Sequence, residues 1–227
     1  MRVLIIAPHP DDDIIGCGGS IAKHIAHSND VGIVFMTSGD VGSGHADAAK
    51  LRTIRETEAK SGAEALGVKT TFFLRFTDGS VVCDVTSITK LAETIAKYKP
   101  DLVYIPHKKD NHKDHIATHA IALESIMMAE GMNNTSSITI LAYEVWTPIT
   151  NVSYIEDITE YMELKVSALQ KHISQVQNTR FDEAVKGLNK YRGVMKGTGG
   201  YSECFEVLRI QEIIPYTTKR LSTFRNK

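Results

Sequence analysis

The sequence has 227 residues, of which 42% are hydrophobic and 23% are charged; this composition is ordinary for a globular protein and fits one domain. Lysine and arginine number 26 and aspartate and glutamate 27, so the formal net charge is -1. This balance argues against a nucleic-acid-binding protein, because binding to phosphates requires an excess of basic side chains.

The N-terminus carries one arginine and a short apolar run, followed at once by acidic residues. The run is shorter than the apolar region of a signal peptide and far shorter than the ~20 residues of a membrane-spanning helix. We therefore expect a soluble, cytoplasmic protein with no membrane partner. Cys17, Cys83 and Cys204 are too widely spaced in the sequence to form a thiolate metal site or a disulfide framework on their own.

Short β-branched runs alternate with longer stretches of helical pattern along the first 143 residues. The predicted strands are 3–7, 31–37, 70–75, 102–106 and 137–142, and the predicted helices are 14–26, 46–66, 85–98 and 113–129. Strands that are apolar throughout and alternate with helices indicate a mostly parallel sheet with helices on both faces. The predicted fold is therefore a Rossmann-like open α/β sheet with right-handed connections.

The pattern is less regular after residue 143. It predicts a long helix at 158–175, a short helix at 181–188 and a strand at 204–210, with a mobile glycine-rich loop at 193–200. We find no linker that would separate this part of the chain. We therefore expect one domain over 1–227, with a core at about 1–143 and an extension of helices and a strand at about 144–227.

Residue types that bind metals follow two of the predicted strands. The first strand is followed by His9, Asp11, Asp12 and Asp13, and the fourth by His107, Asp110, His112, Asp114 and His115. Ligands of open α/β sheets bind at the carboxyl ends of the strands, so both groups are expected at one edge of the sheet. Imidazole and carboxylate without thiolate suit zinc or ferrous iron in a catalytic site.

Simpler explanations exist for both groups. An acidic residue at the start of a helix can serve as an N-cap, but one carboxylate is sufficient for that, and three adjacent carboxylates repel one another. A polar loop that enters a helix would explain His112 and His115. Their expected position at the same edge as the first group favours a metal site.

The run Pro-His-Pro-Asp-Asp-Asp at residues 8–13, followed by glycines at 16, 18 and 19, resembles the His-Pro-Asp-Asp-Glu signature of the PIG-L/LmbE-like zinc deacetylases. Residues 112–115, His-Lys-Asp-His, match the His-x-Asp-His of that family. Weaker similarities at 37–40, 55–58, 74–79, 157–175 and 201–205 extend the resemblance over nearly the whole chain. Asp13 departs from the usual glutamate, which puts its hydrogen-bond partner in doubt.

The resemblance implies a set of roles. His9, Asp12 and His115 would hold Zn²⁺, with Fe²⁺ as the alternative, and Asp11 would be the general base for a metal-bound water. A protonated His112 would stabilise the oxyanion, and Asp114 would orient a site imidazole, for which we expect His112. The implied reaction removes the acetyl group from a small substrate of the N-acetylglucosamine type. Members of the family often assemble as trimers or hexamers, so a homo-oligomer is expected.

Other polar residues also receive roles. For Arg55 the resemblance implies a contact with the hydroxyls or a carboxylate of the substrate, which we favour over a surface pair with Glu56 or Glu58. Gly39 and Asp40, in a loop at the end of a predicted strand, are expected to line the site. Among the other histidines we expect a core or supporting role for His119, no role for His24 and His27 on an exposed helix, a substrate contact for His45, a structural or pocket-wall role for His172, and an undecided role for His107.

Three other functions compete with this hypothesis. A dinucleotide-binding enzyme needs G-x-G-x-x-G at the first helix, but Ile21 stands where the last glycine belongs, and the preceding carboxylates would repel a pyrophosphate. A non-catalytic sugar-binding protein and a hydrolase of a non-sugar amide remain alternatives. The presence of Asp11 beside a full ligand set favours an enzyme over a binding protein.

Overall fold

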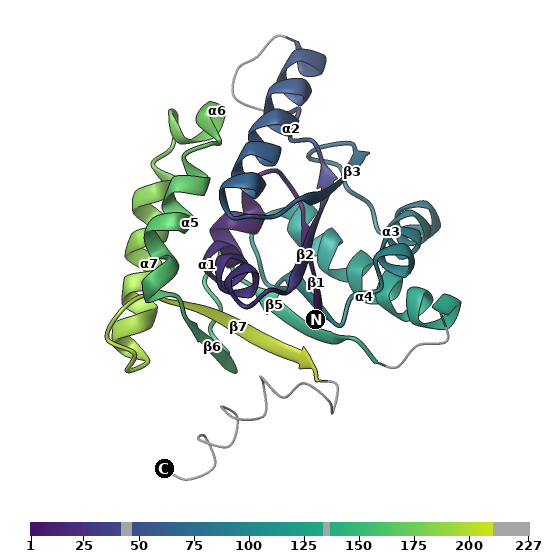
Figure 1. The fold of residues 1–227 in the computed structure, drawn as a ribbon. Helices are drawn as coiled ribbons and strands as arrows, with labels where there is room; N and C mark the ends of the chain where they lie inside the picture. Colours follow the sequence, from purple (N-terminus) through teal and green to yellow (C-terminus); the bar gives the residue numbers. More distant parts are fainter. Residues whose placement is uncertain (42–46, 134–136, 211–227) are drawn as a thin grey trace.

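The strands of the chain form one open sheet. The computed structural model describes residues 1–41, 47–133 and 137–210, and within them seven strands pair in the order β3-β2-β1-β4-β5-β7-β6 (Figure 1). The strands are β1 Arg2–Ala7, β2 Asp30–Thr37, β3 Thr70–Phe76, β4 Leu102–Pro106, β5 Thr139–Tyr143, β6 Tyr154–Asp157 and β7 Ser202–Arg209. The first five are parallel, whereas β7 runs antiparallel to β5 and β6 antiparallel to β7.

Helices cover both faces of this sheet. They are α1 Asp12–Ala26, α2 Ala48–Ala65, α3 Val85–Tyr98, α4 Lys113–Asn133, α5 Met162–Leu169, α6 Ile173–Val176 and α7 Phe181–Met195, with a short 3-10 turn at Thr159–Tyr161. Alternate residues of β1 enter two separate cores: Val3 and Ile5 pack with α1, α2 and α5, while Leu4 and Ile6 pack with α3 and α4. The fully apolar strands of the sequence are therefore buried on both sides, and the predicted fold class is confirmed.

The C-terminal third departs from the predicted elements. Strand β6 was not predicted, and the expected helix at 158–175 is divided into a 3-10 turn, α5 and α6. The backbone of His172, between α5 and α6, is not helical. Helix α7 continues to Met195, seven residues beyond its predicted end at 188, so the predicted loop at 193–200 begins inside a helix. Gly193 serves close packing here: a Cβ at this position would lie 2.2 Å from the carbonyl oxygen of Gly200.

A buried lysine joins this C-terminal part to the N-terminal part of the sheet. Lys165 of α5 donates hydrogen bonds to Glu203 of β7 at 2.6 Å, to Asn189 of α7 at 2.9 Å and to the carbonyl oxygen of Ile15 of α1 at 2.9 Å. Its side chain is fully buried. The C-terminal residues up to 210 thus share the sheet and the core with the rest of the described chain.

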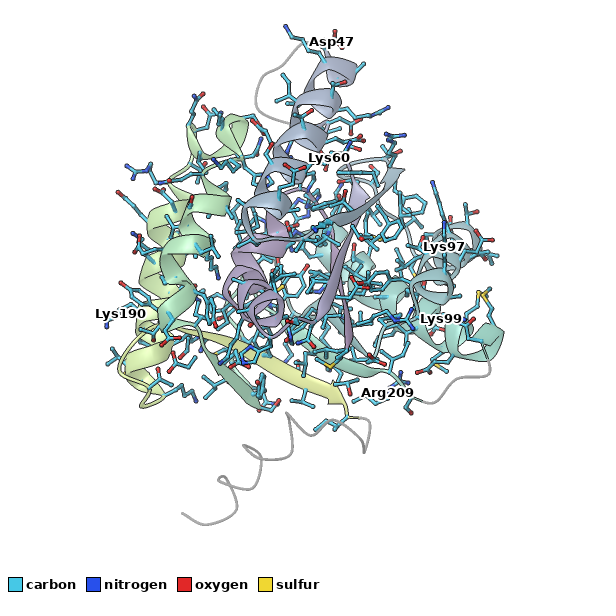
Figure 2. The ribbon with its side chains drawn as sticks, in the orientation of Figure 1. Asp47, Lys60, Lys97, Lys99, Lys190 and Arg209 are labelled. Carbon is cyan, nitrogen blue, oxygen red and sulfur yellow. The ribbon has the colours of Figure 1, made fainter. Side chains whose placement is uncertain are left out.

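The outside of the helices carries charges of both signs. Figure 2 shows this for Asp47 and Lys60 on or beside α2, Lys97 on α3 and Lys190 on α7, all of which are exposed.

His24 was expected to be exposed on α1, which is wrong: it is buried, and its Nε2 lies 3.0 Å from the hydroxyl of Tyr104. In the parts of the chain that the structure describes, no helix combines the length and the apolar character needed to cross a membrane.

Candidate metal centre and active site

Three buried side chains converge at the carboxyl ends of β1 and β4. His9 lies in the turn after β1, Asp12 begins α1, and His115 lies in the first turn of α4. The Oδ2 atom of Asp12 is 3.0 Å from Nδ1 of His9 and 3.1 Å from Nε2 of His115, and these two nitrogens are 3.3 Å apart. The structure therefore brings together the three residues that were predicted as metal ligands.

The separations within this triad fit a bound divalent cation. Zinc lies ~2.0–2.1 Å from nitrogen and oxygen ligands in a tetrahedral site, which places the donor atoms about 3.3 Å from one another. The three measured separations lie close to that value. Two imidazoles and one carboxylate also form a donor set that suits zinc or ferrous iron. The residues present thus fit the metal that the sequence motif implies.

Two other groups of side chains in the described residues could hold a cation. His9 can be combined with His112 and His115, or with Asp78 and Asp114. The second group faces the other ring nitrogen of His9, because Nε2 lies 3.1 Å from Asp114 and 3.2 Å from Asp78. A metal-binding imidazole commonly donates its second N–H to a carboxylate. The arrangement around His9 therefore favours Nδ1 as the donor to the metal and the two carboxylates as its support.

Asp114 is placed differently from the expectation. Its carboxylate contacts His9 and not His112, because the backbone N–H groups of Gly79 and Val81 donate to it at 2.7 and 3.1 Å and hold it toward the loop after β3. Burial alone would raise the pKa of Asp114, but the bonds from His9 and from these backbone groups lower it below the usual range. Asp114 therefore stays charged and orients a predicted ligand.

Two supporting carboxylates, Asp78 and Asp110, received no specific role from the sequence, although Asp110 was among the metal-binding residue types after the fourth predicted strand. Asp78 faces His9 and accepts a hydrogen bond from the backbone of Val41 at 2.8 Å. Asp110 lies 3.5 Å from Nδ1 of His115 and accepts hydrogen bonds from the backbone N–H groups of His112 and Trp146. The only available signal was their position just after the ends of β3 and β4, which does not show what an acidic residue contacts.

Asp11 lies beside the triad in an uncommon backbone conformation. Its φ of 110° is rare for a residue with a side chain and marks local strain. Burial raises the pKa of Asp11 to about 7, against the opposing effect of the nearby Arg55 guanidinium. A carboxylate whose pKa is near neutrality can both accept and return a proton, so Asp11 has the properties of a general base.

Arg55 is buried and supports Asp11. Its guanidinium donates to the carbonyl oxygens of Pro10 at 2.6 Å and Gly39 at 3.1 Å, and to Oδ2 of Asp11 at 3.2 Å. The alternative of a surface ion pair with Glu56 or Glu58 is wrong, because Glu56 pairs with Arg75 and Glu58 binds Ser174. Arg55 also lines the cavity, and its contact with the substrate stays a prediction.

The two other predicted substrate-binding residues do not line the cavity in the described part of the chain. Gly39 adopts φ 63° behind Arg55, and a Cβ at Gly39 would lie 2.1 Å from Nη1 of that side chain. Asp40 pairs with Arg52. Gly39 therefore packs behind Arg55, and Asp40 is engaged with Arg52 outside the cavity, so neither shows the expected direct contact.

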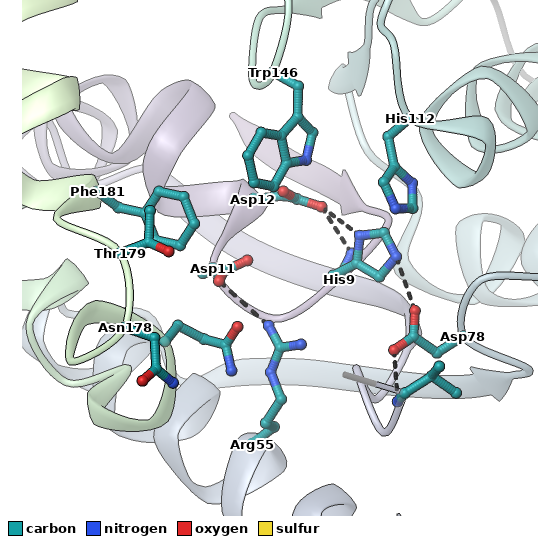
Figure 3. A pocket seen from close by; sticks show the side chains of 12 residues that line it. His9, Asp11, Asp12, Arg55, Asp78, His112, Trp146, Asn178, Thr179 and Phe181 are labelled. Atoms are coloured by element: carbon teal, nitrogen blue, oxygen red, sulfur yellow. Dashed lines mark hydrogen bonds and ion pairs between the residues drawn. The ribbon is translucent and has the colours of Figure 1, made fainter. Parts of the chain in front are cut away.

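The site opens into a cavity of about 510 Å³, a common size for a small-ligand pocket (Figure 3). Its wall combines the predicted residues His9, Asp11, Asp12, Arg55 and His112 and the supporting Asp78 with further residues that were not predicted, namely Val41, Trp146, Gln175, Asn178, Thr179 and Phe181. The latter come from the loop after β2, the segment after β5 and the region around α6. Residues 42–46 lie outside the described chain, so the predicted contact of His45 is not placed.

His112 faces the cavity and is partly exposed. Its Nδ1 accepts a hydrogen bond from the backbone N–H of Asp114 at 3.3 Å, which leaves Nε2 to carry the proton of the neutral ring. Burial and the neighbouring imidazoles of His9 and His115 lower the pKa of His112. Both effects favour a neutral His112 over the protonated ring that was expected, and the neutral ring can still donate one hydrogen bond.

The remaining residues singled out from the sequence lie around this centre. His119 donates through Nδ1 to the carbonyl oxygen of Pro106 at 2.8 Å, and Nε2 of His107 donates to Thr147 at 2.7 Å; both hold loops rather than face the triad. His172 is fully buried and does not line the cavity.

Neither carboxyl oxygen of Asp13 has a hydrogen-bond partner within residues 1–41, 47–133 and 137–210. Burial raises the pKa of Asp13 to about 8, so this carboxyl is largely neutral at pH 7.

The fold and the site together define an open α/β protein with a histidine and aspartate centre at its strand ends. Residues 4–126, more than half of the chain, match the family model "PIG-L: GlcNAc-PI de-N-acetylase". The chain belongs to the PIG-L family.

Similar proteins include deacetylases and a hydratase. The chain is 30% identical over 191 residues to a diacetylchitobiose deacetylase of Thermococcus kodakarensis, covering 77% of this chain and 70% of the relative. The structure of N,N'-diacetylchitobiose deacetylase from Pyrococcus horikoshii is similar with a TM-score of 0.82 and 29% identity, over 96% of this chain and 88% of that one. A 4-oxalmesaconate hydratase of Pseudomonas putida is 27% identical over 188 residues, covering 74% of this chain and 71% of the relative.

Proposed function

We propose that the protein is a metal-dependent deacetylase that removes the acetyl group from a small substrate of the N-acetylglucosamine type. The observation that carries this proposal is the convergence of His9, Asp12 and His115 at metal-ligand separations beside Asp11, in one cavity. The activities named for the two similar deacetylases support the substrate class. Zn²⁺ is the proposed metal and Fe²⁺ the alternative.

The chain supplies the ligands and their orientation. His9, Asp12 and His115 would hold the cation, while Asp114 and Asp78 fix the ring of His9 and Asp110 faces that of His115. When bound, a divalent cation supplies Lewis acidity, which polarises the amide carbonyl and makes a water molecule more acidic.

Asp11 moves the proton of the reaction. Its carboxylate accepts a proton from the attacking water while the new C–O bond forms at the acetyl carbon. His112, as a neutral ring with its proton on Nε2, donates a hydrogen bond to the oxygen that gains negative charge. The C–N bond then breaks, and Asp11 returns the proton to the leaving nitrogen. The products are acetic acid and the free amine, which at neutral pH become acetate and the protonated amine, so atoms and charge balance.

Arg55 keeps Asp11 in the geometry that these transfers require. Three hydrogen bonds from one buried guanidinium join the turn before α1, the loop after β2 and the base itself. This arrangement offsets the strain of the positive φ at Asp11 and aims its carboxylate at the cavity (Figure 3). Arg55 therefore acts first as a positioning residue, and a contact with the substrate would add to that role.

The proposal is tested by metal analysis and by an assay for released amines. Zinc-loaded protein is incubated with N-acetylglucosamine, N,N'-diacetylchitobiose and a non-sugar acetamide, and the free amine is detected by fluorescence. We expect about one metal per chain and amine release from the sugars. Binding of the sugars without amine release would instead identify a binding protein, and release from the non-sugar amide alone would contradict the substrate class.

A second assay addresses the hydratase relative. The same protein is incubated with 4-oxalmesaconate, and hydration is followed by the loss of the absorbance of the conjugated double bond. We expect no hydration. Hydration without any amine release from the sugars would overturn the proposed function.

A further inference from the structure

A second, mainly apolar cavity of about 280 Å³ adjoins the cavity of the site. We call this second cavity the apolar annex. It is lined mainly by Ile15 of α1, Trp146 after β5, and Phe181, Val185 and Leu188 of α7. Trp146, Thr179 and Phe181 line both cavities, and the rings of Trp146 and Phe181 meet edge to face with centroids 5.6 Å apart (Figure 3). The annex therefore adjoins the site, with these three residues at the boundary of both cavities.

The annex offers few polar groups to a ligand. Of its lining residues only Thr179 and Asn189 are polar, and Asn189 is already engaged at both ends of its amide: it donates to the carbonyl oxygen of Ser202 and accepts from Lys165. A sugar hydroxyl placed here would give up its bonds to water without full replacement. The transfer of an apolar group from water into such a cavity lowers the free energy.

The size of the annex defines the group it accepts. An apolar cavity of ~150 Å³ holds one benzene molecule. The annex is larger than this, so a substituted aromatic ring or a short alkyl chain fits. Flat aromatic side chains such as Trp146 and Phe181 favour an aromatic ring, which can pack against their edges and faces.

The position of the annex relative to Asp11 shows which half of the substrate reaches it. Ile15 lies one helical turn after Asp11, and its backbone N–H donates to the carbonyl oxygen of Asp11 at 2.9 Å. The leaving nitrogen must lie within reach of Asp11 to receive its proton. Figure 3 shows His112 apart from Asp11, with Asp12 and His9 between them. The group attached to nitrogen, and not the acyl group, therefore extends toward the annex.

We propose that the amine half of the substrate carries an apolar aglycone, an aryl or short alkyl group, which binds in the apolar annex against Trp146 and Phe181. This inference rests on the proposed function, because the direction of the substrate follows from Asp11 as the base. The sugar ring would lie in the polar part of the main cavity, beside Arg55, Gln175 and Asn178.

The test compares phenyl and methyl glycosides of N-acetylglucosamine. We expect kcat/KM for the phenyl glycoside to exceed that for the methyl glycoside by roughly 10-fold or more, the usual effect of a filled apolar pocket. Ala184→Phe fills the annex from the exposed side of α7 and should reduce this ratio to near 1. Val194→Phe places the same side chain on the same helix, at an exposed position outside both cavities, and should leave the ratio unchanged.

A second measurement needs no turnover. Trp146 is the only tryptophan of the sequence, so its fluorescence reports directly on the annex. The phenyl glycoside should change the emission of the unmodified and Val194→Phe proteins with saturation, and should bind more weakly to Ala184→Phe. The methyl glycoside should cause a smaller change.

The outcomes separate this inference from the proposed function. Equal kcat/KM for both glycosides, with no saturable change in emission, would overturn the inference while the deacetylase function stands. Saturable binding of the phenyl glycoside that Ala184→Phe abolishes, with no amine release from any sugar, would support an apolar site and overturn the function. A gain in kcat/KM for N-hexanoyl over N-acetyl substrates that Ala184→Phe removes would show that the acyl group occupies the annex, which contradicts the proposal.

Discussion

Adjacent carboxylates in this protein have different environments and therefore different properties. Oδ2 of Asp12 lies between two imidazoles; burial alone would raise its pKa, but the charges and hydrogen bonds of His115 and His9 hold the pKa well below the usual range. Asp11 lacks these partners, and burial raises its pKa to about 7. Asp12 thus stays charged, as its proposed role of metal ligand requires, and Asp11 can exchange a proton.

The first prediction separates the two residues by an isosteric change. Asp11→Asn should keep its metal and lose activity by ~10²–10⁴-fold, because an amide cannot accept the proton of water. Asp12→Asn should lose affinity for metal first, with part of the activity restored by excess zinc, because a neutral amide is a poorer ligand. Measurements of metal content and amine release for both variants distinguish the base from the ligand. Rescue of the Asp11 variant by zinc, with an inactive but metal-loaded Asp12 variant, would show that the roles are exchanged.

The second prediction concerns Arg55 as a positioning residue. Arg55→Ala removes all three bonds that hold the turn at Asp11, and a misplaced catalytic group can cost ~10²-fold in rate. We expect a loss of this size in kcat, with little change in metal content. Arg52→Ala, on the same helix but paired with Asp40 outside the cavity, should behave like the unmodified protein. A rise in KM at unchanged kcat would show instead that Arg55 serves substrate binding alone.

The sequence predicted a metal site because metal-binding residue types follow two strand ends, which a parallel sheet brings together. The choice of His9, Asp12 and His115 among them came from the resemblance to the PIG-L/LmbE-like deacetylases. The sequence could not predict what each supporting group contacts. Asp114 turns toward His9 because two backbone N–H groups after β3 hold it there, and Asp110 approaches His115 from a loop. Those contacts depend on loop conformation, which the residue types alone do not determine.

At the scale of elements, the glycines at the start of α1 allow close packing. A Cβ at Gly16 would lie 2.2 Å from the ring of Tyr143, and one at Gly19 would lie 2.6 Å from the side chain of Ile158. The hydroxyl of Tyr143 donates to the carbonyl oxygen of Ile6, so its ring has little freedom to move. The glycine run therefore places α1 close to β5 and to the segment before α5, and provides no phosphate-binding loop.

The third prediction compares two glycines in helices. Gly16→Ala should lower the free energy of unfolding by roughly 1–3 kcal/mol, the usual cost of overpacking a core. Gly187→Ala in the middle of α7 meets no atom within 4 Å and should raise it by about 0.5–1 kcal/mol, because alanine favours the helix. Denaturant unfolding of both variants measures these changes. An unchanged stability of Gly16→Ala would contradict the packing role.

The elements that were predicted well have a regular pattern and clear ends. Helix α3, for example, begins after Asp84, whose side chain accepts from the backbone of Ser87, and ends before Pro100. The elements predicted poorly depend on distant partners. Strand β6 has four residues and exists through its pairing with β7, and the break after α5 occurs without proline or glycine.

At the scale of the whole molecule, the Lys165 network connects parts of the chain that are far apart in sequence. Glu203 accepts from Lys165 and also from the backbone N–H groups of Gly19 and Ser20. Both charged side chains are almost fully buried. Removal of either partner would destabilise the folded protein, because the remaining charge would be buried without compensation.

The fourth prediction removes one partner of this pair. Lys165→Met should lower the free energy of unfolding by about 3–5 kcal/mol, since Glu203 would then be buried without a cation. The double variant Lys165→Met with Glu203→Gln should recover part of this loss. Denaturant unfolding of the single and double variants gives the values. A single variant as stable as the unmodified protein would show that the lysine contributes little to joining the two parts.

The fifth prediction concerns the pH dependence of stability through His24, which lies away from the metal centre. Burial lowers the pKa of His24 to about 4, with smaller effects of the positive charges of His27, Lys23 and the N-terminus. An unfolded histidine has a pKa of ~6.5, so between pH 6.5 and 4 the unfolded chain binds a proton that the folded protein excludes. The stability contributed by the neutral ring is present above pH 6.5 and is lost as the pH falls through this window.

The measurement compares the unmodified protein with His24→Gln, which keeps a hydrogen-bond donor for Tyr104 but does not titrate. The difference in unfolding free energy between pH 7 and pH 5 should be smaller in the variant by about 2 kcal/mol. His172, whose pKa is lowered to about 3 mainly by burial, acts in the same direction in both proteins and cancels in the comparison. An identical loss of stability in the two proteins would mean that His24 accepts a proton in the folded state as readily as in the unfolded chain. That result would contradict the prediction that its buried ring stays neutral down to about pH 4.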